Sequence, residues 1–347
     1  MSTALTAIKA PTIFQLEKFS GDDIAAHAGI NARKTKKVGN KAILWGAIAG
    51  TLPDLDVLIK YFTDEISATQ MHRGFSHSIV FAVLIAPLLG WIAKKIHFKL
   101  KDISFKDWTK LFFWSTVTHP LLDAHTTWGT QFFWPFNYRL AYQNIFVIDP
   151  IYTLPFLVFL VLAIFHKKEN PKRTKLNFIG LSLSSLYLIL TLGFKWISFN
   201  EFEKELSQQK IEYIEMDTKP APLNSILWSS LIETKNGYRT AYYSLLDKKQ
   251  ITFSNEFAKN HKLIEPYMDQ KIVKQLIKIS AGWYRIEKKN NQLLFWDLRF
   301  GQMGIDVNNA SFLWYYELNI DKNGEINAIK KQPKINNFNE IFRLIYE

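Results

Sequence analysis

Three short motifs in the first half of the chain place histidine and aspartate at spacings that suit a metal site. They are Pro-Asp-Leu-Asp at 53–56, His-Arg-Gly-Phe-Ser-His-Ser at 72–78 and His-Pro-Leu-Leu-Asp at 119–123. On a helix, residues four apart share a face, so His119 and Asp123 can offer two ligands from one rigid element. Imidazole and carboxylate ligands suit zinc, and also manganese or iron. Such a metal activates water and polarises an ester or phosphoryl oxygen.

Each motif has a simpler explanation when it is taken alone. A Pro-Asp pair at a helix end is usually a turn, and histidines beside an apolar run can be packing or interfacial residues. A His–Asp pair can also hold two helices together by hydrogen bonding. Taken jointly, the motifs predict a divalent metal site, with zinc favoured and manganese or iron as alternatives, whose ligands are Asp54, His72, His77, His119 and Asp123.

Two neighbouring residues have predicted roles beside these ligands. Asp56 is expected to be a further ligand or a catalytic base. Arg73 is expected to bind an anionic substrate or intermediate, and contact with a lipid headgroup is the alternative for it. The chain has no cysteine, which excludes disulfide scaffolds, cysteine-ligated zinc and thiol nucleophiles.

The elements that carry these motifs are apolar enough for a membrane. Four apolar runs lie at 79–93, 111–128, 145–165 and 176–194, and a shorter run at 42–52 stops at the first motif. A membrane helix needs about 20 residues. The sequence therefore predicts a membrane α-helical bundle of about five passes, the first one short. Buried helices of a soluble α-protein are the alternative explanation.

The charges between these runs predict an orientation. The connections at 31–41, 94–110 and 167–175 are rich in lysine and arginine, whereas the two connections between them are not. Basic connections face the cytoplasm, so the chain after the last pass should lie outside it. The same orientation puts all three motifs toward the outer side of the membrane, where they can converge.

The formal net charge of +12 raises the question of nucleic-acid binding. The excess cations sit in connections beside the apolar runs, where anionic lipid headgroups account for them. Membrane lipids are therefore the predicted partners, and nucleic acid is not expected.

The second half has a different pattern, which predicts a small soluble α+β domain with an antiparallel sheet at 197–347. Asn236-Gly237 lies between two strand-like runs, which is a strong hairpin signal, and a second hairpin is predicted at 283–299. One or two helices are expected over 255–279 and a closing helix over 337–346. This domain has no cluster of residues that suggests chemistry, and a protein partner is open for it.

The predicted organisation is thus a polar, basic segment at 1–38, a transmembrane domain at 39–196 and the soluble domain at 197–347. Four stretches carry a family resemblance, namely Gly39-Asn40-Lys41-Ala42, Gly50–Asp56, His72–Ser78 and Thr118–Asp123. Together they resemble the inner-membrane metal-dependent hydrolases of the YdjM type, which are also described as LexA-binding. The resemblance covers roughly residues 39–165 and implies an integral protein of the bacterial inner membrane with hydrolase activity.

One part of the chain departs from that family pattern. Such proteins usually begin with an apolar helix, with a polar residue near its start, just ahead of the Gly-Asn-Lys stretch. Here the first 38 residues are polar and basic, and His27 or Asp22-Asp23 are the candidates to replace that residue.

Two functions follow from these observations. The first is a membrane-bound, metal-dependent hydrolase that acts on an ester or phosphoester, with lipid-derived substrates included. The alternative is a non-catalytic membrane-anchored binding or regulatory protein with a structural His/Asp cluster. Binding of a cytoplasmic repressor fits poorly with a large domain outside the cytoplasm.

Overall fold

The structure is a computed structural model that describes residues 38–167, 169–246, 250–290, 292–303, 308 and 311–333. The predicted N-terminal segment, with His27 and Asp22-Asp23, lies outside the described residues except for Val38. The predicted closing helix at 337–346 also lies outside them.

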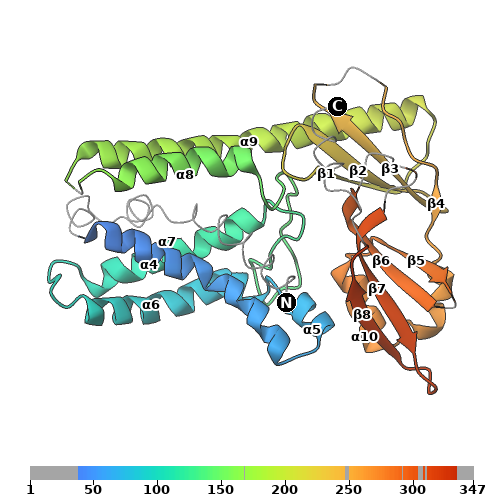
Figure 1. The fold of residues 1–347 in the computed structure, drawn as a ribbon, viewed down its shortest axis with the longest axis horizontal. Helices are drawn as coiled ribbons and strands as arrows, with labels where there is room; N and C mark the ends of the chain where they lie inside the picture. The colour runs from blue at the N-terminus through green and yellow to red at the C-terminus, as the bar shows by residue number, and fades with distance from the viewer. Residues whose placement is uncertain are drawn as a thin grey trace. The chain divides into compact units, whose positions relative to one another are not determined.

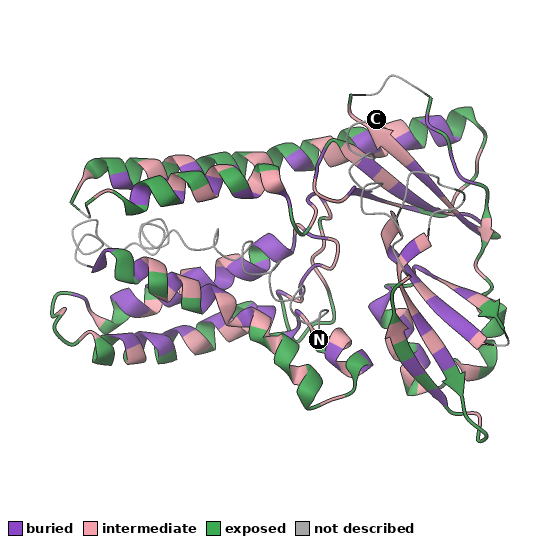
Figure 2. Cartoon of the chain, viewed as in Figure 1, coloured by how far each residue is buried: buried purple, intermediate pink, exposed green. Residues whose placement is uncertain are grey.

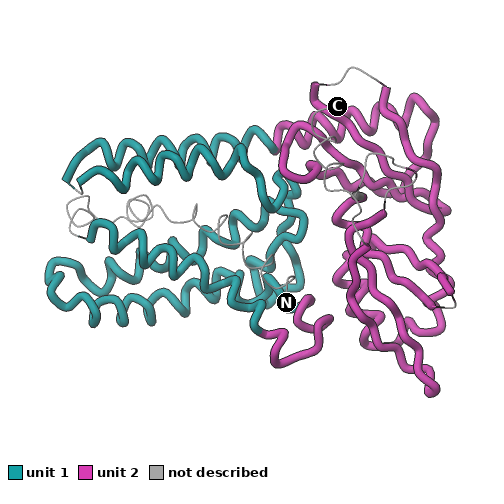
Figure 3. Tube along the Cα trace, viewed as in Figure 1, with its two compact units in different colours: residues 1–58, 71–191 teal, residues 59–70, 192–347 magenta. Residues whose placement is uncertain are grey.

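The described chain divides into two compact units (Figure 3). Unit 1 holds the described residues up to Leu58 together with Met71–Thr191. Unit 2 holds Ile59–Gln70 together with the described residues from Leu192 onward. A short segment near the first motif therefore belongs to the same unit as the second half of the chain.

Unit 1 is helical, and it contains a closely packed antiparallel pair, α6 and α7, with α4 against α7 (Figure 1). The helices of the first half, in chain order, are α4 (Asn40–Thr51), η2 (Pro53–Tyr61), α5 (Glu65–Met71), η3 (Phe75–His77), α6 (Ile79–Ile96), α7 (Phe105–Asp123), α8 (Pro150–Ile164) and α9 (Pro171–Gln208).

The described helices give fewer candidate membrane spans than the five predicted passes. By length and composition α6 and α9 can each cross a membrane, and α4 with η2, bent by 44°, can form a third span. Helix α8 has only 15 residues. Helix α7 begins at Phe105, well before the predicted run, and carries a buried polar face that includes His119 and Asp123. The count of five is therefore not confirmed, because one predicted span is short and another is partly polar.

The outer faces of the unit 1 helices are nevertheless suited to lipid. Figure 2 shows exposed positions along α6 and α8. Many of them are large apolar side chains, including Val83, Leu84 and Leu88 on α6 and Leu154 and Val158 on α8. An exposed apolar surface of this extent marks an interaction with another protein or with a membrane.

Small residues let α6 and α7 approach closely. Ala82, Ala86, Gly90 and Ala93 are buried on α6. A Cβ added at Gly90 would lie only 2.9 Å from the backbone nitrogen of Thr109 on α7. Stripes of small residues of this kind are typical of helix pairs in membranes, where close backbone contact provides the packing energy.

Unit 2 contains two four-stranded antiparallel sheets, which confirms the predicted antiparallel α+β character. One sheet has the order β1-β2-β3-β4 and the other β5-β6-β7-β8. Their strands are β1 (Glu215–Pro220), β2 (Leu227–Glu233), β3 (Gly237–Ser244), β4 (Phe257–Ala258), β5 (Tyr284–Lys289), β6 (Gln292–Met303), β7 (Ser311–Ile320) and β8 (Ile326–Lys331).

The two predicted hairpins are confirmed as β2–β3 and β5–β6. The helices predicted over 255–279 are only partly right. The described helices there are α10 (Lys271–Ile279) and the short turns η4 (His261–Leu263) and η5 (Glu265–Tyr267). Phe257 and Ala258 form β4 instead, because they pair with the start of β3.

The segment Ile59–Gln70 is held within unit 2 by specific contacts. The side-chain amide of Gln275 on α10 donates to Ser67 Oγ at 3.1 Å and to Gln70 Oε1 at 3.0 Å. Ile66 and Ala68 of α5 are buried. This segment therefore packs with residues that follow it by about 200 positions, as the pair separations of 208 and 205 show.

The close approach of α6 and α7 predicts a specific loss of stability. Gly90→Ala should lower the free energy of unfolding by about 1–3 kcal/mol, because the new methyl group meets the backbone of Thr109. Gly193→Ala on α9 is the matched control, since an added Cβ there meets nothing within 4 Å. The check is thermal unfolding of both variants in detergent. Equal midpoints for the two variants would contradict this packing.

Candidate metal centre

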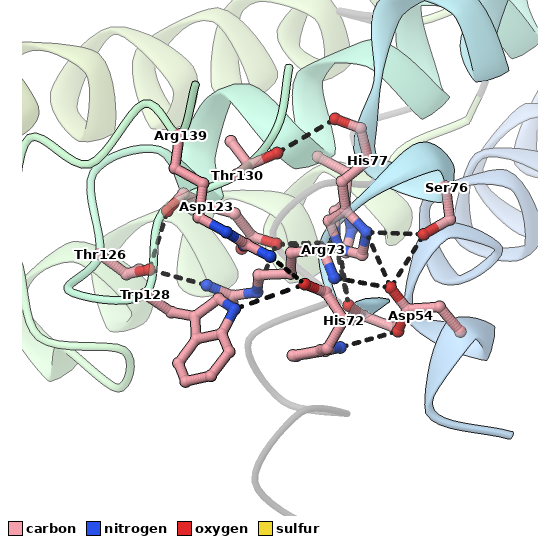
Figure 4. Close-up of polar contacts among 12 residues, drawn as sticks. Asp54, His72, Arg73, Ser76, His77, Asp123, Thr126, Trp128, Thr130 and Arg139 are labelled. Atoms are coloured by element: carbon pink, nitrogen blue, oxygen red, sulfur yellow. Dashed lines mark hydrogen bonds and ion pairs between the residues drawn. The ribbon is translucent and has the colours of Figure 1, made fainter. Parts of the chain in front are cut away.

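Four side chains from three elements bring their ligand atoms together where α4 ends, α6 begins and α7 ends. Asp54 lies in the first turn of η2, and His77 is the last residue of η3. His119 and Asp123 share a face of α7. One ligand atom from each of the four lies within 4.8 Å of the others, so the group can hold a metal ion. These four residues are called the metal group below (Figure 4).

The separations of the ligand atoms fit one tetrahedral ion. His77 Nε2 lies 3.2 Å from Asp54 Oδ1 and 3.3 Å from Asp123 Oδ2. His119 Nε2 lies 3.2 Å and 3.1 Å from the same two oxygens, and the two Nε2 atoms are 3.2 Å apart. A zinc ion with ligands at about 2.0–2.1 Å has ligand–ligand separations of about 3.3 Å in a tetrahedron. The chemistry and spacing of the group therefore fit zinc.

The local sequence explains how these side chains are placed. Pro53 follows directly on the C-terminal end of α4 and opens the 3₁₀ turn, which bends the path by 44° and brings Asp54 into the first turn. Ser78 ends η3 and caps α6 by accepting from the Phe81 backbone N–H, so His77 is fixed just before the helix. The spacing of four places His119 and Asp123 together.

The centre of the metal group favours positive charge. His77 and His119 are fully buried and Asp123 is nearly so. Burial lowers the pKa of His77, but its contacts with Asp123, Asp54 and Asp56 outweigh burial and raise the pKa to about 9. The surrounding carboxylates thus stabilise a cation, either as a proton on His77 or as a metal ion bound by the group.

Asp56 lies behind His77 and is not one of the four grouped residues. Its Oδ2 accepts from the Arg73 backbone N–H at 2.8 Å and from Ser76 Oγ at 2.9 Å, and it lies 3.3 Å from His77 Nδ1. A carboxylate accepts hydrogen bonds, so Nδ1 of His77 holds the proton and Nε2 is left as the metal-facing acceptor. This is how a carboxylate behind a ligating histidine fixes its tautomer.

His72 also contacts Asp56 and lies outside the metal group. Its Nδ1 is 2.8 Å from Asp56 Oδ1, and its side chain is 31% exposed. Burial lowers the pKa of His72 below its usual value, although Asp56 opposes that shift. Burial thus favours the neutral form of His72, and its Nδ1 donates to Asp56 because a carboxylate only accepts.

Arg73 is buried beside the metal group, with a positive backbone φ of 55°. Its Nε lies 3.3 Å from Asp123 Oδ2, and its Nη1 donates to Thr126 Oγ1 at 2.8 Å. The guanidinium thus balances part of the negative charge of Asp123.

Several supporting residues were not predicted as part of the site. Thr130 Oγ1 donates to the His77 carbonyl at 3.1 Å, and Arg139 Nη2 donates to the His72 carbonyl at 2.8 Å. Ser76 contacts both Asp56 and His77. Ser76 stands within the second motif, but Thr130 and Arg139 follow the third motif in an irregular stretch with no pattern that connects them to it.

The part of the chain that carries this site is similar to known proteins. Residues 24–202, about half of the chain, match the model of the YdjM inner membrane protein family. The chain belongs to the YdjM inner membrane protein family. It is 33% identical over 105 residues to the inner membrane protein YbcI of Escherichia coli (strain K12). That alignment covers 30% of this chain and 58% of YbcI, and no solved structure matches the chain.

The resemblance predicted from the motifs is thus confirmed, and the chain is an inner membrane protein of this family with apolar helices that can span a membrane. The match contains all four residues of the metal group and begins at residue 24, within the predicted N-terminal segment.

The metal group predicts the metal content of variants. Wild-type protein purified in detergent should hold about one equivalent of zinc or manganese, and His77→Ala or Asp123→Ala should lose it because three donors remain. His125→Ala is the control, since His125 contacts Asn144 outside the group and should keep the metal. The measurement is elemental analysis, with gel filtration to check folding. Equal metal content in all forms would reject the site.

Asp56→Asn should weaken metal binding without abolishing it. It leaves the four donors in place but weakens the acceptor behind His77 Nδ1. Metal affinity should fall by about 10–100-fold, which is typical for a lost partner behind a ligand. If Asp56→Asn instead loses the metal as completely as Asp123→Ala does, Asp56 is a direct ligand.

Proposed function

We propose that this protein is a membrane-bound, metal-dependent hydrolase of esters or phosphoesters. The observation that carries the proposal is the metal group, whose donor separations suit one zinc ion. A divalent metal held there supplies a Lewis acid that polarises the substrate oxygen and lowers the pKa of a bound water. Manganese and iron are alternatives for the same ligand types.

The group is open on one side, which supports catalysis. The carboxylate of Asp54 is 22% exposed, whereas the side chains of His77, His119 and Asp123 are at most 2% exposed. Water and substrate can therefore approach past Asp54. A catalytic metal site needs such an approach, because water or substrate must bind the metal, here as a further ligand beside the four protein donors.

The neighbouring residues have separate tasks in this proposal. Asp56 and Ser76 hold the tautomer of His77. His72 is neutral, and with Nδ1 directed at Asp56 its Nε2 is an acceptor that can take a proton from water. The guanidinium of Arg73 contacts Asp123 of the metal group, and this position suits it to stabilise negative charge that develops on the substrate.

A structural metal site is the second candidate, and one observation favours it. Four protein ligands are typical of closed zinc sites that stabilise a fold rather than catalyse a reaction. The three segments that supply the ligands are far apart in sequence, so one ion would join them. In this case the protein would be a membrane-anchored binding or regulatory protein.

Metal removal separates the two candidates. For a hydrolase, chelation should lower the turnover of nitrophenyl esters or phosphoesters by about 10²-fold or more, while the protein stays folded. Zinc or manganese should restore the activity, and metal-free Asp123→Ala should show none at any metal concentration. For a structural site, chelation should lower the unfolding midpoint, and metal-loaded protein should turn over no ester. Both quantities can be measured on one preparation.

We also propose that unit 2 lies outside the cytoplasm, where it is available to a protein partner. The α6–α7 and α8–α9 connections, both rich in lysine, lie at the end of unit 1 where α4 begins, which supports one cytoplasmic end (Figure 1). Alkaline phosphatase fused after Glu347 should then be active, and a green fluorescent protein fused there should be dark. The reverse pattern would place unit 2 in the cytoplasm.

A further inference from the structure

The metal group is bordered by exposed aromatic side chains. Phe75 is 42% exposed and stands two residues before His77. Four more lie at residues 133–138 of the connection between α7 and α8, with Phe136 and Tyr138 the most exposed, at 72% and 62%. The five residues of this aromatic rim are Phe75, Phe133, Trp134, Phe136 and Tyr138.

The rim is joined to the metal group by hydrogen bonds and ring contacts within unit 1. The Gln131 backbone N–H donates to the Arg73 carbonyl at 3.0 Å, and the Ile79 N–H donates to the Phe132 carbonyl at 3.0 Å. The rings of Phe75 and Trp134 have centroids 4.9 Å apart. The α7–α8 connection is therefore fastened to the segment that carries His77, so the rim and the metal group keep a fixed spacing.

The start of α6 indicates the depth of this region. Ile79 is the first residue of a candidate membrane span, and His77 precedes it by two residues. Val83 and Leu84, one turn further on, are 54% and 62% exposed, as expected for residues that face lipid. The metal group thus lies at the end of a candidate span, and at the end of a span the hydrocarbon core meets the headgroup layer. Tryptophan and tyrosine concentrate at the same level in membrane proteins.

The phosphoester of a phospholipid lies at that level, between the acyl chains and the water. Two guanidinium groups stand close to the metal group, Arg73 beside Asp123 and Arg139 on the carbonyl of His72. Guanidinium groups suit phosphate because their geometry matches its oxygens. Cations next to the group and exposed apolar rings on the segments joined to it are the two features that a lipid phosphoester needs.

We propose that the substrate is a membrane phospholipid, whose phosphoester reaches the metal group while its acyl chains stay in the bilayer along the aromatic rim. In the reaction the oxygen of water bonds to phosphorus, the bond from phosphorus to the alcohol oxygen breaks, and that oxygen takes up a proton. This proposal rests on the proposed hydrolase function and names its substrate.

The test compares a lipid substrate with a soluble one on the same metal-loaded, full-length protein. Phosphatidylglycerol and phosphatidate in mixed micelles are the lipid substrates, and nitrophenyl and bis-nitrophenyl phosphate are the soluble ones. In Phe136→Ser the ratio of lipid kcat/KM to soluble kcat/KM should fall about tenfold, which corresponds to the loss of one buried aromatic contact with lipid. Phe98→Ser is the matched control, because Phe98 is 70% exposed and lies in the connection at the opposite end of α6.

The outcomes separate this proposal from the one it rests on. Turnover of soluble phosphoesters without turnover of either lipid would overturn the lipid substrate and leave the hydrolase standing. An unchanged ratio in Phe136→Ser, or an equal fall in Phe98→Ser, would remove the role of the rim. A metal-loaded wild-type protein that turns over none of the four substrates, and no nitrophenyl ester either, would overturn both. Tyr138→Ser repeats the measurement if Phe136→Ser does not fold.

Discussion

Two carboxylates and two imidazoles held together, three of the four buried, impose the constraint on which the rest of unit 1 depends. Charges of one sign removed from water are costly unless an opposite charge compensates them. The metal group meets this requirement by favouring a cation between Asp54 and Asp123, and Arg73 adds a second positive charge beside Asp123. The surrounding elements hold the charged and ionisable atoms of these residues 3.1–3.3 Å apart.

That constraint explains why α7 differs from the more apolar helices beside it. Helix α7 buries Ser115, Thr116, His119 and Asp123, so its inner face is polar while neighbouring helices are apolar. Close packing against the small residues of α6 lets this polar face be covered by protein and not by lipid, which is where ionisable groups in membranes are tolerated. The cost is reduced further because Asp56, Ser76 and Thr130 satisfy the remaining polar atoms of the His77 region.

Much of the metal group could be predicted from the sequence, because two simple rules apply to it. The spacing of four joins His119 to Asp123, and the alternation of basic connections places the other motifs at the same end of the bundle. What the rules could not separate was His72 from His77, or Asp54 from Asp56. Those choices depend on two short 3₁₀ turns, η2 and η3, whose geometry decides which side chain of each motif faces inward. The prediction of Asp56 and Arg73 as groups of the reaction stays a prediction.

The fold could be predicted where it depends on residues close together in the sequence, and not where it depends on residues far apart in the sequence. Both hairpins were found from their turns, since each turn joins strands that are neighbours in the chain. The division into two sheets and the pairing of β4 with β3 depend on long-range contacts that leave no periodic pattern. The predicted count of five membrane spans is not confirmed in the described residues, because apolar content alone did not show where α8 begins or that α7 begins in a charged turn.

The assignment of Ile59–Gln70 to unit 2 has a consequence for the biosynthesis of the protein. The ribosome makes this segment early, directly between Asp54 and His77, yet its partner Gln275 is made more than 200 residues later. Domains made in one piece can fold as they emerge, but a discontinuous one must wait for its last part. Unit 2 therefore closes only after Gln275 has been made. Until then Ile59–Gln70, which joins Asp54 to His77, has no partner in unit 2. A nascent or truncated chain would therefore carry the residues of the metal group but lack the contacts that hold this segment.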